Sequence, residues 1–212
     1  MTAERFDALN AAVVDALRQA ATQPFMPRPE LETARTRLEG LSFTSASKRP
    51  PHPMVARELE SAAVRHADAR KVHHALIDAS PFLTWNGAER VYGREPGMEA
   101  FCASYAFAAL AAPASWVGDG GAASSTVGLS FTVQGPGVTY PPHAHKAVEL
   151  YYIIAGKGLW KCGDEPWIER YPGEVILHTA GMRHAMRTLD QPLVSLAIWI
   201  TDVDSPIAIV RA

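Results

Sequence analysis

The strongest constraint on this chain is the segment 137–156, which reads GVTYPPHAHKAVELYYIIAG. His143, His145, Glu149 and Tyr151 all carry odd numbers, and alternate side chains of an extended strand share one face. If the segment is extended, two imidazoles, a carboxylate and a phenol point the same way. The surrounding apolar residues and the Pro141–Pro142 pair fit poorly with ordinary polar residues on a solvent-facing strand.

A third imidazole, His184, lies in the segment 173–184 (GEVILHTAGMRH). Two imidazoles and a carboxylate from one strand, joined by an imidazole from another, suit a divalent first-row metal and leave room for solvent or substrate. The sequence therefore predicts a metal site inside a small β-barrel. His178, at the end of a predicted strand, is interpreted as a structural histidine, with a place behind the ligands as the alternative.

Aromatic residues accompany the predicted ligands. Tyr151 falls on the ligand face, Tyr140 lies just before the two prolines, and Trp199 is on the last predicted strand. For Trp199, a place in the core and a place in a pocket wall are equally favoured. Tyr152 is expected on the opposite face and Trp160 outside the barrel. An aromatic pocket beside a Lewis-acid metal suits a small substrate with a carboxylate and a cationic or apolar end.

The first half of the chain has helical patterns. Apolar residues recur at three- and four-residue steps in residues 1–22, which predicts an amphipathic helix. Further helices are predicted at 30–39, 54–78 and 98–112, separated by a proline-rich loop and a turn-rich connection. In the third helix, His66 and His73 share a face, and we interpret them as exposed rather than as metal ligands.

After residue 113 the pattern changes to short β-branched and aromatic runs separated by glycine and proline, which is typical of an antiparallel sandwich or barrel. The predicted division is a helical segment at 1–113, packing on a β-barrel at 114–212. The fold class is mostly β with a helical N-terminal part. Strands are expected at 125–134, 147–154, 158–162, 166–170, 174–178, 184–189 and 193–201.

Charge and cysteine content exclude several classes of protein. The net charge is -2 with no basic block, so nucleic acid and anionic membranes are not expected partners. Cys102 and Cys162 lie far apart, and neither belongs to a C-x-x-C pair, so free buried thiols are expected. The N-terminus lacks a signal-peptide pattern and the longest apolar run is too short for a bilayer, which predicts a cytoplasmic protein.

The predicted metal site resembles the cupin family. Gly137, His143, His145, Glu149 and Gly156 match the first cupin motif, G-x5-H-x-H-x3-E-x6-G, at every position. The second motif is met at Gly173, Gly181 and His184, whereas Thr179 and Thr188 replace its usual proline and asparagine. The resemblance covers roughly residues 125–204 and implies a single double-stranded β-helix barrel, with His143, His145, Glu149 and His184 as metal ligands.

Within the cupins, the chain resembles the dimethylsulfoniopropionate (DMSP) lyases that carry a helical segment before one barrel. The resemblance is carried by Tyr140 to His145, the Glu149-x-Tyr151 pair, Gly181 to Thr188, and Trp199. It implies that Tyr151 is a general base, that Tyr140 and Trp199 bind a zwitterionic sulfonium substrate, and that the metal is zinc, iron or manganese. It also implies β-elimination to acrylate and dimethyl sulfide, by a monomer or homodimer.

Two alternatives stay open from the sequence. A non-haem iron dioxygenase can use the same three-histidine, one-glutamate ligand set, although a tyrosine beside the metal would crowd the position that O₂ needs. A non-enzymatic cupin that binds a small ligand is the other.

Overall fold

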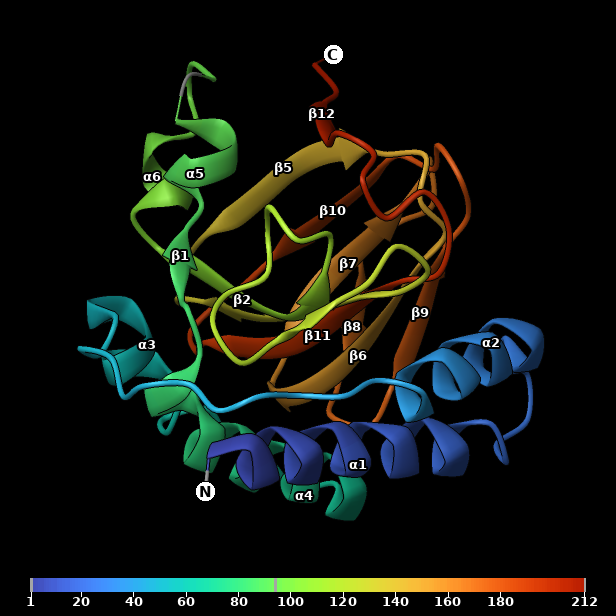
Figure 1. The fold of residues 1–212 in the computed structure, drawn as a ribbon. Helices are drawn as coiled ribbons and strands as arrows, with labels where there is room; N and C mark the ends of the chain where they lie inside the picture. Colours follow the sequence, from blue (N-terminus) through green and yellow to red (C-terminus); the bar gives the residue numbers. More distant parts are fainter. Residues whose placement is uncertain (1, 94, 212) are drawn as a thin grey trace.

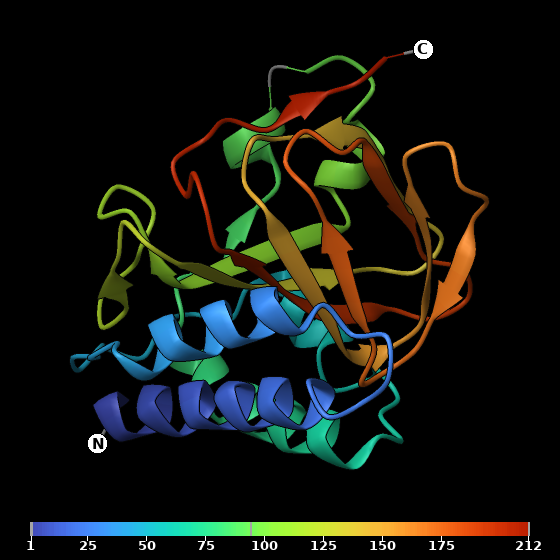
Figure 2. The same cartoon turned by 90° about the vertical axis from the view of Figure 1, so that its right-hand side faces the viewer.

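Two β-sheets curve around a common interior in the computed structural model, which describes residues 2–93 and 95–211 (Figures 1 and 2). The larger sheet has the strand order β1-β2-β4-β11-β6-β9, with the short β3 pairing with β2. The smaller sheet has the order β12-β5-β10-β7-β8. All the strand pairs are antiparallel except β2 with β3.

The strands of the larger sheet are β1 (Asn86–Gly87), β2 (Tyr105–Ala112), β3 (Ala122–Ala123), β4 (Gly128–Gln134), β6 (Glu149–Gly156), β9 (Val175–His178) and β11 (Leu193–Trp199). Those of the smaller sheet are β5 (Thr139–Ala144), β7 (Gly158–Cys162), β8 (Ile168–Arg170), β10 (His184–Arg187) and β12 (Ala208–Ile209). Each of the seven strands predicted after residue 113 is present, with ends that differ by a few residues. The predicted β-barrel with N-terminal helices is therefore confirmed.

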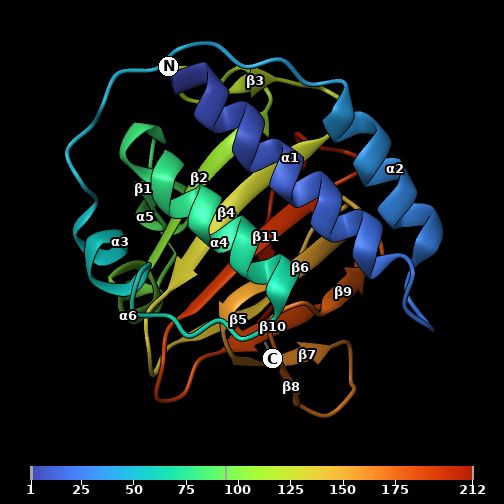
Figure 3. The ribbon, with the colours of Figure 1, turned by 90° about the horizontal axis from the view of Figure 1, so that it is seen from below.

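The helices are α1 (Thr2–Ala20), α2 (Arg28–Glu39), α3 (Pro53–Glu58), α4 (Ala67–Ala79), α5 (Glu89–Tyr92) and α6 (Glu99–Cys102), with a 3-10 turn η1 at Ser80–Phe82. Helices α1, α2 and α4 cover one face of the larger sheet (Figure 3), whereas α5 and α6 contribute to the core inside the barrel. The amphipathic pattern predicted for the first helix is confirmed, because Phe6, Leu9, Val13 and Leu17 are all buried. Met1, the first residue of that predicted helix, lies outside the described residues.

The helix predicted at 98–112 is wrong. Only α6 is helical there, and residues 105–112 form β2, which pairs with β4 over most of its length. An unbroken apolar run such as YAFAALAA has no helical or strand periodicity, so local pattern cannot distinguish a buried strand from a buried helix. Pairing with β4 stabilises these residues as a strand. The larger sheet thus begins before residue 114, where the barrel was predicted to start.

The single helix predicted at 54–78 is also wrong. It is divided into α3 and α4 by residues 59–66, where the backbone leaves the helical conformation. His66 caps α4 by accepting the N–H of Ala69 at 3.4 Å. His73 is buried rather than exposed, and its Nε2 donates to the carbonyl of Leu59 at 2.8 Å.

The parity of β6 separates two apolar cores. Leu150, Tyr152 and Ile154 belong to the core between the larger sheet and the helices. Tyr151 and Ile153 belong to the interior of the barrel. Tyr152 therefore faces away from Tyr151, as predicted. Trp160, which was expected outside the barrel, is buried in the interior core instead.

Gly156 ends β6 in a conformation that other residues rarely adopt. Its φ is +74°, and a Cβ atom there would lie 1.9 Å from the carbonyl oxygen of Pro192. The glycine that closes the first cupin motif is thus needed where β6 passes close to the start of β11.

Candidate metal centre

Strand pairing assembles the candidate site from five strands of the two sheets, rather than from one extended segment. His143 on β5 pairs with His184 on β10. Glu149 opens β6 and has two cross-strand partners, His178 on β9 and Trp199 on β11. Side chains of directly opposed residues lie on the same face of a sheet, so these groups meet inside the barrel.

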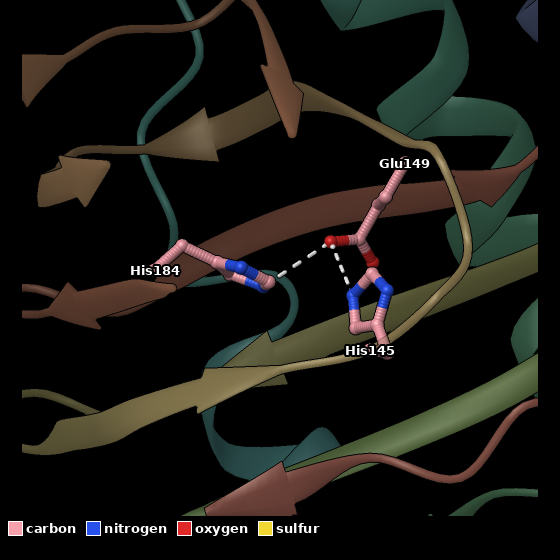
Figure 4. A group of neighbouring side chains, drawn as sticks. All are labelled: His145, Glu149 and His184. Carbon is pink, nitrogen blue, oxygen red and sulfur yellow. Dashed lines mark hydrogen bonds and ion pairs between the residues drawn. The ribbon is translucent and has the colours of Figure 1, made fainter. Parts of the chain in front are cut away.

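Three of the four predicted ligands converge (Figure 4). His145, Glu149 and His184 each offer one ligand atom, and these three atoms all lie within 4.8 Å of one another. Nε2 of His145 lies 3.2 Å from Oε2 of Glu149, and Nε2 of His184 lies 3.3 Å from the same oxygen. All three side chains are buried.

The fourth predicted ligand, His143, lies beside this group rather than within it. Its ring is 4.1 Å from the ring of His184 and 6.5 Å from that of His145, measured between centroids. The ring of Tyr140 stacks on His143 at 3.7 Å.

Each of the three imidazoles is oriented by a backbone carbonyl two residues away. Nδ1–H of His143 donates to Pro141 at 2.8 Å, that of His145 to Ala147 at 3.0 Å, and that of His184 to Met182 at 2.9 Å. A carbonyl can only accept, so Nδ1 carries a proton and Nε2 is the nitrogen left for a metal, which is the usual arrangement of a metal-binding histidine. Among the described residues, Nε2 of His184 is buried and has no hydrogen-bond partner.

The two motif segments are joined by a backbone bond. Gly181, with φ +73°, donates its N–H to the carbonyl of His145 at 2.8 Å. This bond fixes the loop that precedes His184 against the loop that follows His145, although the usual proline of the second motif is absent.

The electrostatics of the site favour an ionised carboxylate. Burial opposes the charge on Glu149, but the imidazoles of His145, His178 and His184 around the carboxylate outweigh burial and hold the pKa of Glu149 well below its usual range. Burial, followed by the neighbouring His184, lowers the pKa of His143 well below its usual range. Three imidazoles and one carboxylate form a donor set that fits a divalent cation such as zinc, iron or manganese.

A pocket of about 460 Å³ opens beside these ligands. His143, His145 and Glu149 form part of its wall, and the three aromatic residues singled out from the sequence, Tyr140, Tyr151 and Trp199, line it too. Trp199 therefore belongs to the pocket wall. Ala197, the cross-strand neighbour of Tyr151 on β11, also lines the pocket, and its small side chain leaves space in front of the phenol.

Sequence reasoning missed several pocket residues. Tyr92, Tyr105 and Trp116 line the same pocket, and the hydroxyl of Tyr92 is hydrogen-bonded to that of Tyr140. Tyr105 falls in the segment that was wrongly predicted as helix. Tyr92 ends the short helix α5, in a segment predicted as a connection, and Trp116 lies in a turn without a strand register. No local pattern in the sequence could bring them to the site.

His178 has a closer relation to the site than its interpretation as a structural histidine suggested. It is fully buried, its ring stacks on that of His184 at 3.7 Å, and its Nδ1 lies 3.0 Å from Oε2 of Glu149. Burial lowers the pKa of His178 to about 4.

With this geometry in view, the comparison with known families is decisive. The sequence model of the DMSP lyase family (dimethylsulfoniopropionate lyase) matches residues 34–195. The chain belongs to the DMSP lyase family. The match includes the converging ligands, the tyrosines of the pocket and the helices from α3 to α6.

Individual relatives agree with this assignment. The dimethylsulfoniopropionate lyase DddQ of Ruegeria pomeroyi is 34% identical over 90 residues, which cover 42% of this chain and 45% of that protein. The chain thus spans less than half the length of the curated relatives it matches. In neither relative does the matched part include the whole protein.

Solved structures share the fold over nearly the whole chain. A chain from the crystal structures of the DMSP lyases RdDddP and RnDddQII superposes with a TM-score of 0.73 at 21% identity, covering 100% of both chains. The crystal structure of DddQ from Ruegeria pomeroyi gives a TM-score of 0.64 at 24% identity, covering 92% of this chain and 96% of that one. None of the helices in residues 2–93 and 95–211 is both long and apolar enough to cross a membrane.

Proposed function

We propose that this protein is a metal-dependent carbon–sulfur lyase that cleaves DMSP to acrylate and dimethyl sulfide by β-elimination. Membership of the DMSP lyase family supports the reaction. The observation that carries the proposal is the placement of Tyr151 in the same pocket as His143, His145 and Glu149. A candidate base and candidate metal ligands thus face one pocket whose wall includes several aromatic side chains.

In this proposal, His143, His145, Glu149 and His184 hold one divalent cation, which is zinc, iron or manganese. When bound, the cation would supply positive charge that acidifies the C–H bond beside the substrate carboxylate and favours a phenolate at Tyr151. The inward-facing Nε2 atoms and the ionised carboxylate of Glu149 support this ligand set.

Tyr151 is proposed as the general base. Its phenolate oxygen takes the proton from the carbon next to the carboxylate. The electron pair of that C–H bond forms the carbon–carbon double bond of acrylate, and the C–S bond breaks. Sulfur keeps the bonding pair, and dimethyl sulfide leaves as a neutral molecule.

Tyr140 and Trp199 are proposed to bind the substrate. Aromatic faces attract a cation such as a sulfonium through their quadrupole, by roughly 0.5–2 kcal/mol depending on how much water is excluded. Trp199 is proposed to supply such a face, whereas the ring of Tyr140 is stacked on both His143 and Phe101 and bonded to Tyr92, so it forms a rigid part of the pocket wall. We expect the protein to act as a monomer or homodimer.

The test is direct. Purified protein loaded separately with zinc, iron or manganese is incubated with DMSP, and dimethyl sulfide is measured in the headspace, with acrylate measured in solution. Release of both products in equal amounts is expected. The proposal fails if no metal gives release above the metal-stripped control.

A further inference from the structure

Glu149 lies between two hydrogen-bond donors that come from the strands on either side of it. In the larger sheet β6 is flanked by β11 and β9, and the register pairs Glu149 with Trp199 on one side and with His178 on the other. The carboxylate is therefore reached from both neighbouring strands, on the face that looks into the barrel.

The two donors use different oxygens. Nε1–H of Trp199 donates to Oε1 of Glu149 at 2.7 Å. Nδ1 of His178 lies 3.0 Å from Oε2, the oxygen that also faces His145 and His184. An indole nitrogen can only donate and an ionised carboxylate can only accept, so the direction of the first bond is fixed by chemistry.

His178 is set up to donate as well. Its side chain is fully buried, and among the described residues its Nε2 has no hydrogen-bond partner. A neutral imidazole with the proton on Nδ1 satisfies the bond to Glu149 and leaves only an acceptor unpaired. The stacking of its ring on His184 fixes the plane of the imidazole.

We propose that Trp199 and His178 are positioning residues that hold the carboxylate of Glu149, so that Oε2 points toward the inward nitrogens of His145 and His184. This inference rests on the metal site of the proposed function. Trp199 would then have two roles. Its indole N–H, the only polar group of the side chain, donates to Glu149, while the face of the ring lines the pocket.

His178 differs from the proposed histidine ligands in the nitrogen that it turns toward Glu149. Its Nδ1 lies 3.0 Å from Oε2 of Glu149, whereas the Nδ1 atoms of His143, His145 and His184 are bonded to backbone carbonyls. Groups behind a metal ligand fix its orientation, and their removal raises the metal dissociation constant by roughly 10- to 100-fold. Metal affinity is therefore the readout, measured by competition with a chromogenic chelator and independent of any substrate.

Trp199→Phe keeps an aromatic ring and removes the donor. The metal dissociation constant is expected to rise about 10-fold or more. Trp85→Phe is the matched control, because Trp85 also donates its indole N–H, to Ser80, but lies outside the pocket. The proposal is overturned for Trp199 if its variant binds metal within about twofold of the wild type, or if the Trp85 variant loses the same affinity.

His178 is tested by a pair of variants and a reference. His178→Phe keeps a ring but removes the donor, whereas His178→Asn keeps a donor near the position of Nδ1. The phenylalanine variant should lose about 10-fold or more in affinity, and the asparagine variant should recover most of it. His184→Asn serves as the reference for loss of a ligand. If His178→Asn weakens metal binding as much as His184→Asn does, His178 is a ligand and the positioning role is wrong.

Failure of this inference and failure of the proposed function are distinguishable. If the Trp199 and His178 variants bind metal with normal affinity, the positioning role is wrong. Dimethyl sulfide release by the wild type remains a separate test of the lyase proposal. A wild type that binds metal but releases no dimethyl sulfide removes the lyase proposal, whereas the affinity differences among these variants still stand. Thermal unfolding of each metal-free variant identifies any that do not fold.

Discussion

Tyr151 is proposed to act as a base, but its surroundings disfavour the phenolate that this role requires. Burial first, and then the charge of Glu149, raise the pKa of Tyr151 well above its ordinary value. A phenolate base therefore needs positive charge close by, and the neighbouring candidate ligands are where that charge would be bound. The residue and the metal site are expected to depend on each other for activity.

Replacing Tyr151 by phenylalanine should abolish most turnover while leaving metal binding intact. Loss of a general base lowers the rate by roughly 10²–10⁴-fold, and phenylalanine preserves the packing of the ring against Trp160. Headspace dimethyl sulfide and metal content are measured on the same sample. Comparable activity in the variant would remove Tyr151 from the role of base.

Thr188 shows how a departure from the second cupin motif is accommodated. The residue is buried, and its hydroxyl donates to the carbonyl of Gly135 at 2.6 Å and accepts the N–H of Val138 at 3.0 Å. It thus fixes the loop that leads into β5, where the motif usually has asparagine, and contributes no atom to the site.

Thr188→Val should lower the free energy of unfolding by about 1–3 kcal/mol, because it leaves two buried backbone groups without partners at almost unchanged side-chain volume. Thr188→Ser retains the hydroxyl and is the control. Chemical denaturation of both variants gives the comparison. Metal affinity should be unchanged, and a large loss of affinity in Thr188→Val would show that the loop governs the site after all.

At the scale of elements, the contact between α4 and the end of α3 is expected to make stability depend on pH through His73. His73 on α4 is buried and donates to Leu59, just after the end of α3. Burial lowers the pKa of His73 below its ordinary value of 6.5. As the pH falls below about 6.5, the unfolded chain binds a proton at this histidine that the folded chain does not, so stability decreases with decreasing pH.

His73→Gln should weaken this acid sensitivity, since an amide can still donate to Leu59 but does not titrate. The free energy of unfolding is measured by urea denaturation from pH 7.5 down to pH 5. His74→Gln is the matched control, because His74 is the exposed neighbour on the same helix. An unchanged pH profile in the His73 variant would assign the acid sensitivity to other groups.

At the scale of the whole molecule, the site is also a junction between the two sheets. Glu149 belongs to the larger sheet, His143 and His184 belong to the smaller one, and His145 follows directly after β5. A bound cation would thus connect the two sheets from inside the barrel. Binding to the folded state alone adds about 2.7 kcal/mol when free metal is 100 times the dissociation constant.

Removal of metal should therefore lower the melting temperature by about 5–10 °C for a chain of this size. Differential scanning calorimetry with and without a chelator measures the shift, and His184→Ala should show little of it. A melting temperature that does not respond to metal in the wild type would argue against a site that joins the sheets.

The sequence by itself determined seven of the strands after residue 113, whereas β3, β5 and β12 were not predicted. Strand parity places Glu149 and Tyr151 on one face of β6, because alternation along an extended chain is a local property. The amphipathic first helix follows from spacing in the same way. These features depend on neighbours along the chain, so pattern is sufficient to predict them. The extended segment considered from His143 to Tyr151 is interrupted between β5 and β6, so His143 and His145 reach the site from the other sheet.

Tertiary structure alone decided the rest. β2 is a strand only because β4 pairs with it, and local pattern could not choose for a continuous apolar run. Tyr92 and Tyr105 reach the pocket, and His178 and Trp199 reach opposite sides of Glu149, through contacts between residues far apart in the sequence. Cross-strand register is set by pairing and packing over the whole barrel, so no segment of the chain contains it.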